Sequence, residues 1–168
     1  LTPDKAVARI LSEVRTRGDS SLFDYSRRID RVELTQLGVI TEEVAESYKM
    51  VSKELVSALA FAAERVRSFH LAQKRNLGLD FVEGGLGFIV RPLERVGVYV
   101  PGGRACYPST VLMTAIPAKV AGVAEVVIVT PPAPDGMIPA STLVAADIAK
   151  VDRIFKVGGA QAIAALAY

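Results

Sequence analysis

Two glycine pairs mark the places in this sequence where a ligand could approach the backbone. One closes the segment Tyr99-Val100-Pro101-Gly102-Gly103, and the other lies within Val157-Gly158-Gly159-Ala160-Gln161. Paired glycines allow positive φ and remove side chains that would hold a ligand away. Neither segment has the GxGxxG spacing of a dinucleotide fingerprint or the lysine of a P-loop. Each pair therefore predicts either a cofactor cradle or an ordinary turn.

Tyr99 and Gln161 are the polar side chains best placed beside these glycines. The Tyr99 ring could flank a planar heterocycle while its hydroxyl reaches a polar group, and the alternative is a tyrosine at the edge of the core. Gln161 falls in the first turn of a predicted helix, where phosphates and carboxylates are favoured, and the alternative is a capping or surface glutamine. If both residues serve one ligand, they must be near neighbours in the fold.

The residue types that catalysis usually needs are scarce. A catalytic zinc needs about three Cys, His or carboxylate ligands, whereas the chain has one His and one Cys, without zinc-ligand spacings. We expect His70 to lie on a helix face and Cys106 to be a small, partly buried filler. Ser109 and Thr110 have no nearby histidine to act as a base, so we predict that they cap a helix. The sequence therefore predicts no catalytic residue and no metal ligand among these 168 residues.

Carboxylates are equally sparse toward the C-terminus. After Glu125 the sequence contains only Asp135, Asp147 and Asp152. Their positions in predicted loops and at helix ends suit turns and caps. They are therefore weak candidates for a general acid or base.

The elements that must position Tyr99 and Gln161 follow from the distribution of charge. Residues 1–95 carry 15 basic and 14 acidic groups, whereas residues 96–168 carry 5 and 4. A segment with so few charges is buried on most faces, as in a parallel sheet covered by helices. We therefore predict a helical arm with a connecting hairpin over residues 1–93 and a second domain over residues 94–168.

The arm is predicted to contain helices and then a short hairpin. Thr2-Pro3-Asp4 begins a first helix, which Gly18 ends. A second helix is expected from Asp19 or Ser20 to Ile29. Residues Thr41 to Phe69 are expected to form either one long helix or two, with Ser52 capping the second. The expected hairpin has strands Leu79–Val82 and Phe88–Val90 around Glu83-Gly84-Gly85.

The second domain alternates β-branched runs with helical segments. The expected elements are strand Val96–Val100, helix Ser109–Val120, strand Val126–Thr130, helix Ala140–Ala149 and strand Ile154–Val157. This order predicts an α/β fold in which the helical arm precedes an incomplete Rossmann-like parallel βαβαβ unit. Ligands of such sheets bind beyond the carboxyl ends of the strands, where both glycine pairs are expected.

The sequence ends on an apolar run. Ala160–Tyr168 contains no charged residue and no Gly or Pro that would end a helix. Such a helix needs a neighbour to bury it, so we expect the chain to be the N-terminal part of a longer protein, truncated within a helix. The alternative is the frayed end of a complete domain.

Composition excludes several classes of protein. With 51% hydrophobic residues and no apolar run near 18 residues, the chain is expected to be soluble, globular and not membrane-spanning. The net charge of +2 and the acidic groups among the basic helical residues Arg65, Arg67, Lys74 and Arg75 argue against nucleic-acid binding. A single cysteine and no signal-peptide pattern indicate a cytoplasmic protein.

Several stretches of the sequence resemble histidinol dehydrogenases. The longest are RVGVYVPGGRACYPSTVLMTAIPAKVAGV at 95–123 and VGGAQAIAALAY at 157–168, and shorter ones are RGDSSL at 17–22 and FHLAQ at 69–73. The resemblance covers essentially the whole chain. It implies an NAD-dependent, zinc-requiring homodimeric enzyme that oxidises an amino-alcohol, L-histidinol, through the aldehyde to L-histidine, the last step of histidine biosynthesis.

The resemblance also assigns residues. Tyr99 and Gln161 match family positions that bind NAD, whereas the family's substrate, zinc and general-base residues lie beyond Tyr168. It follows that this chain would supply the NAD-side wall of the active site and would be inactive by itself. The alternative is a non-catalytic nucleotide-binding or assembly module with the same fold.

Overall fold

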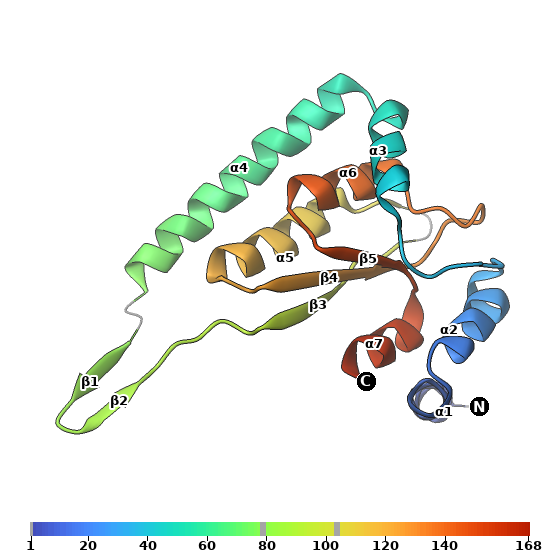
Figure 1. Ribbon diagram of the computed structural model, residues 1–168, viewed down its shortest axis with the longest axis horizontal. Helices are drawn as coiled ribbons and strands as arrows, with labels where there is room; N and C mark the ends of the chain where they lie inside the picture. Colours follow the sequence, from blue (N-terminus) through green and yellow to red (C-terminus); the bar gives the residue numbers. More distant parts are fainter. Residues whose placement is uncertain (1, 78–79, 103–104) are drawn as a thin grey trace.

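A three-stranded parallel sheet lies at the centre of the computed structural model, which describes residues 2–77, 80–102 and 105–168 (Figure 1). The strands β3 (Arg95–Tyr99), β4 (Glu125–Thr130) and β5 (Arg153–Lys156) are hydrogen-bonded in that order. Helices α5 (Pro108–Ala121) and α6 (Ala140–Ile148) are the crossovers between them. The predicted α/β class and the parallel βαβαβ unit are therefore confirmed.

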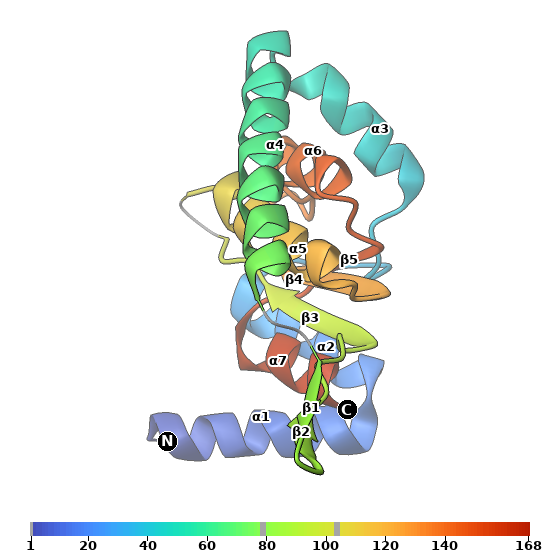
Figure 2. The same cartoon turned by 90° about the vertical axis from the view of Figure 1, so that its left-hand side faces the viewer.

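One face of the sheet is covered by α5 and α6, with α3 (Thr41–Met50) and α4 (Lys53–Asn76) packed on these helices. Figure 2 shows α4 as the long outer helix on this side. Fully buried aliphatic side chains from strand and helices, among them Ile128, Ile116 and Val144, form one continuous core that reaches Ala63 of α4. This face contains the larger of the two hydrophobic clusters, and we call it the α5–α6 face.

The opposite face carries α7 (Gly159–Ala167), α2 (Asp19–Tyr25) and α1 (Pro3–Arg17), and we call it the α7 face (Figure 2). Its smaller cluster joins Val14, Leu22, Val129 and Ala162. A cavity of about 390 Å³ lies between these helices and the sheet. The packing on this face is therefore less complete than on the α5–α6 face.

The segment after α2 brings the chain back to the sheet. A π-helix, η1 (Ser26–Asp30), follows α2, and the backbone then runs antiparallel to β5 through a bridge between Gly38 and Phe155. The N–H of Lys156 donates to the carbonyl of Leu37 at 2.7 Å. This contact places the segment around Gly38 along the β5 edge of the sheet.

The helices of the arm differ from their predicted limits at one position and settle an open alternative at another. The helix expected to reach Ile29 is α-helical only to Tyr25, because the N–H of Arg31, at φ +60°, closes a wider turn on the carbonyl of Ser26. The region from residue 41 forms two helices, and the Ser52 hydroxyl caps the second by accepting from the N–H of Leu55 at 3.2 Å.

The predicted caps of α5 are wrong. Tyr107 occupies the cap position, and Ser109 and Thr110 lie inside the first turn. Pro108 stands at the first helical position, where its fixed φ and missing N–H are well tolerated. The helix therefore begins before either hydroxyl residue can cap it.

The predicted hairpin is confirmed with shifted limits. Its strands are β1 (Phe81–Glu83) and β2 (Leu86–Phe88), paired antiparallel around Gly84 and Gly85, and Leu79 lies outside the described residues. The hairpin projects away from the sheet at the end of α4 (Figure 1). The division into domains at residues 93 and 94 stays a prediction. Among the described residues, no helix is both long and apolar enough to cross a membrane.

Candidate functional site

The carboxyl ends of the three strands open into a hollow of about 450 Å³. Tyr99 at the end of β3, Pro131 after β4 and Gly159 after β5 line it together with Gly102 and Asp30. We call this the strand-end hollow. Its position is the one that parallel α/β sheets commonly use for ligands.

Two of the predicted glycines allow the loops around this hollow to touch. A Cβ at Gly102 would lie 2.7 Å from Cγ of Pro131, and a Cβ at Gly158 would lie 2.5 Å from Cβ of the same proline. Both distances are too short for a real side chain, so the loops after all three strands meet at Pro131 only because these positions are glycine. Gly103 lies outside the described residues.

Tyr99 is joined to the start of α7. The backbone N–H of Gly159 donates to the Tyr99 hydroxyl at 3.2 Å, and Gly159 has φ +63°, which favours glycine. The half-buried Tyr99 ring packs against the hydrophobic cluster on the α7 face and also lines the strand-end hollow. Both interpretations of Tyr99, core edge and ligand wall, thus describe part of its setting.

Gln161 is 1% exposed, and neither its amide nitrogen nor its amide oxygen has a hydrogen-bond partner among the described residues. Its Oε1 lies 2.6 Å from the position that a Cβ on Gly159 would occupy. The amide therefore folds back against the first residue of α7, behind the wall of the hollow. The alternative of a surface glutamine is wrong.

The structure brings Tyr99 and Gln161 together at one residue, Gly159. Tyr99 contacts it through a hydrogen bond from the hollow side, and Gln161 contacts it from the interior. The requirement that the two residues be near neighbours is met. Their binding of NAD stays a prediction.

Asp30 was missed in the sequence and stands in the same hollow. Its Oδ2 is buried and has no hydrogen-bond partner among the described residues. Burial raises the pKa of the Asp30 carboxyl above its ordinary value. No local sequence signal predicts that Asp30 lies in this hollow, because its neighbours there come from loops far along the chain.

The other candidate residues lie away from the hollow. His70 is on α4, where its Nδ1 lies 2.9 Å from Oε1 of Gln73. Cys106 is exposed, so the expectation of a partly buried filler is wrong, because the residue lies in the loop before α5 rather than between packed layers. Neither residue joins a group of three or more metal-ligating side chains in the described part of the chain.

The three late aspartates have structural partners. Asp135 accepts from the N–H of Met137 at 2.9 Å, as expected for a turn. Asp147 accepts from the Tyr48 hydroxyl at 2.6 Å, and Asp152 accepts from the N–H of Val126 at 2.6 Å and from Lys119 at 2.5 Å. These contacts join helices and strands on the α5–α6 face.

The strand-end hollow can bind a ligand better than it can transform one. The residues that line it offer the Tyr99 ring and the Asp30 side chain, and α7 begins at its wall with Gly159, behind which the Gln161 amide is buried. The residues that line it provide no nucleophile paired with a base. The arrangement suits a ligand with a planar ring and hydrogen-bonding groups.

Comparison with known proteins identifies the family to which the chain is similar. Residues 2–168 match the family model for histidinol dehydrogenase. The histidinol dehydrogenases of Syntrophotalea carbinolica and Dehalococcoides mccartyi strain CBDB1 are 53% and 50% identical to it, over 98% and 99% of this chain. A crystal structure of histidinol dehydrogenase from Elizabethkingia anophelis has a TM-score of 0.89 and 34% identity over 96% of this chain. The chain spans only 38% of that structure and 38–39% of the two curated relatives.

Proposed function

The chain belongs to the histidinol dehydrogenase family, and from this premise we propose that it forms the NAD-side wall of an enzyme that oxidises L-histidinol through the aldehyde to L-histidine. The observation that carries the proposal is the buried amide of Gln161 at the start of α7, which has no hydrogen-bond partner in the described part of the chain and lies next to the hollow that Tyr99 lines. A buried amide without partners is unfavourable. A ligand that supplies the missing hydrogen bonds removes that penalty.

The residues present fit a dinucleotide. Tyr99 offers an aromatic ring for a planar base, and α7 begins beside the hollow, where the positive end of the helix dipole favours phosphate. Gln161 offers both a donor and an acceptor in one amide. NAD would accept hydride from the substrate carbon, and these residues would hold and orient it.

We assign the zinc site and the general base to residues outside 1–168. The support is the inventory of the chain, which has one His and one Cys, and the family resemblance, which also favours a cytoplasmic homodimer. Purified residues 1–168 are therefore expected to produce no NADH from histidinol. Turnover above a no-enzyme control that a chelator abolishes would overturn this assignment.

The test of the proposal compares NAD⁺ binding to the full-length protein and to variants, measured by calorimetry. Gln161→Met keeps the volume of the side chain and removes the amide, and Tyr99→Ala removes the ring. Each is expected to weaken NAD⁺ binding by about tenfold or more. The matched controls are Gln36→Met and Tyr107→Ala, which alter exposed residues that are not among those lining the hollow.

Two outcomes separate function from folding. In steady-state assays of the full-length enzyme, the KM for NAD⁺ should rise far more than the KM for histidinol. Gln161→Met should melt at the same or a higher temperature, because it removes a buried group without partners. Unchanged NAD⁺ affinity with a lowered melting temperature would show that both residues only stabilise the fold.

A further inference from the structure

Asp30 lines the strand-end hollow, and one of its carboxylate oxygens has no hydrogen-bond partner among the described residues. The residue ends the π-helix η1, and this oxygen is its buried Oδ2. Ser26 at the other end of η1 also has a buried, unpartnered hydroxyl. Short π-helical turns occur frequently at functional sites.

A buried carboxylate oxygen without a partner needs hydrogen-bond donors. Burying a carboxylate without hydrogen bonds is costly, and the raised pKa of Asp30 reflects that burial. The other residues that line the hollow are mainly prolines and glycines, with Tyr99 as the other polar side chain among them, and the Tyr99 hydroxyl already accepts from Gly159. A ligand that carries hydroxyl groups would supply what the protein lacks.

We propose that Asp30 accepts hydrogen bonds from the ribose hydroxyls of the dinucleotide in the strand-end hollow and thereby selects NAD⁺ over NADP⁺. This inference rests on the proposed function. A carboxylate can accept two hydrogen bonds from a vicinal diol, whereas it repels a phosphate on the same sugar. Asp30 is a binding residue in this scheme and takes no part in hydride transfer.

The relative positions in the hollow agree with this assignment. Gly159, at the start of α7, and Asp30, at the end of η1, contribute separate parts of the same wall. The helix start favours the diphosphate, and the carboxylate disfavours it. Phosphate would thus be favoured near Gly159 and disfavoured near Asp30.

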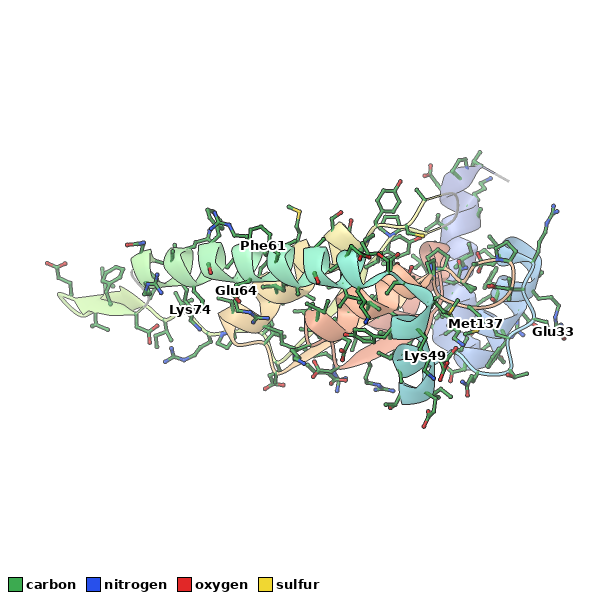
Figure 3. The ribbon with its side chains drawn as sticks, turned by 90° about the horizontal axis from the view of Figure 1, so that it is seen from above. Glu33, Lys49, Phe61, Glu64, Lys74 and Met137 are labelled. Carbon is green, nitrogen blue, oxygen red and sulfur yellow. The ribbon has the colours of Figure 1, made fainter. Side chains whose placement is uncertain are left out.

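The experiment measures dissociation constants of the full-length protein for NAD⁺ and NADP⁺ by calorimetry, with Asp30→Asn as the test variant. Asp30→Asn keeps the shape of the side chain and removes its charge. The matched control is Glu33→Gln, which removes the same charge three residues later from a side chain that is 80% exposed and ion-paired to Arg27 at 3.5 Å. Figure 3 shows Glu33 at the outer margin of the molecule.

We expect Asp30→Asn to weaken NAD⁺ binding by about tenfold and to reduce the preference for NAD⁺ over NADP⁺ by at least as much. Its melting temperature should stay the same or rise, because a buried unpaired charge is removed. Glu33→Gln should change neither dissociation constant by more than about twofold. Ser26→Ala should leave the NAD⁺/NADP⁺ ratio unchanged.

The outcomes distinguish this inference from the proposed function. If the unmodified protein binds neither nucleotide, both are overturned. If Tyr99→Ala and Gln161→Met weaken NAD⁺ binding while Asp30→Asn leaves the NAD⁺/NADP⁺ ratio unchanged, only the role of Asp30 is wrong. If Asp30→Asn and Ser26→Ala both lower the melting temperature and spare nucleotide binding, the two side chains stabilise η1 alone.

Discussion

The two faces of the sheet are built from the same strands but differ in how completely their groups are satisfied. On the α5–α6 face, Ile116, Ile128 and Val144 are completely buried in one continuous core. On the α7 face the cluster is smaller, and a cavity of about 390 Å³ separates part of it from the sheet. Apolar packing is therefore concentrated on one side.

The hydrogen bonding of buried polar side chains differs in the same direction. On the α5–α6 face, Tyr48 bonds to Asp147 and Lys119 bonds to Asp152. Among the described residues, the buried side-chain atoms without partners belong to Ser26, Asp30 and Gln161, which lie in η1 and α7. Gln161 lies on the α7 face, and Asp30 lines the strand-end hollow, whose wall includes the first residue of α7.

This difference indicates that the two faces have different roles. Evenly satisfied groups stabilise a fold, whereas buried groups without partners persist where another molecule completes them. We infer that the α5–α6 face supplies stability and the α7 face is preorganised for a ligand. Substitutions on the two faces should therefore differ in size and even in sign.

The largest expected effect is a cavity on the α5–α6 face. Ile116→Ala removes a fully buried side chain from the continuous core and should lower the free energy of unfolding by about 3 kcal/mol. Leu37→Ala removes a side chain that already borders the cavity on the α7 face and should cost about 1–2 kcal/mol. Urea unfolding measures both. Equal losses would contradict the difference in packing.

The next effect concerns backbone geometry at the start of α7. Gly159→Ala places a Cβ at φ +63°, 2.6 Å from Oε1 of Gln161, and should destabilise the protein by about 1–2 kcal/mol. Gly38→Ala on the same face is the control, because its Cβ would meet only Phe155 at 3.9 Å. That control should change the free energy of unfolding by about 0.5 kcal/mol or less.

The affinity for NAD⁺ is the second quantity to measure for Gly159→Ala. Displacement of the Gln161 amide should weaken NAD⁺ binding, whereas Gly38→Ala should leave it intact. If Gly159→Ala destabilises the protein yet binds NAD⁺ normally, the amide does not contact the ligand.

The strands and crossovers of the sheet could be predicted from sequence because their signals are local. Short β-branched runs alternate with helical segments, and Ser52 caps α4 as its position suggests. The burial of Asp30 could not be predicted, because it depends on loops near residues 99, 131 and 159 that converge only in the fold. Likewise, Tyr99 and Gln161 could be nominated, but their shared contact with Gly159 required the structure.

A smaller effect tests whether the two faces respond with opposite signs. Tyr48→Phe removes a satisfied hydrogen bond from the α5–α6 face and should lower the free energy of unfolding by about 1 kcal/mol. Gln161→Met removes an unsatisfied amide from the α7 face and should leave that free energy equal or raise it. Losses of the same size in both variants would contradict the asymmetry.

The smallest expected effect is the loss, at alkaline pH, of the stabilisation that the Tyr48 hydroxyl provides. Burial, followed by the hydrogen bond to Asp147 and its charge, raises the pKa of Tyr48 to about 12, whereas an unfolded tyrosine has a pKa near 10. Because the folded pKa is the higher one, the stabilisation is complete below about pH 10 and is lost as the pH rises toward about 12. The difference in unfolding free energy between the unmodified protein and Tyr48→Phe should therefore be constant from about pH 7 to 9 and should shrink above about pH 10. All other groups are the same in the two proteins, so the difference isolates Tyr48. A difference that stays constant to about pH 12 would show that the pKa of Tyr48 is not raised in the folded protein.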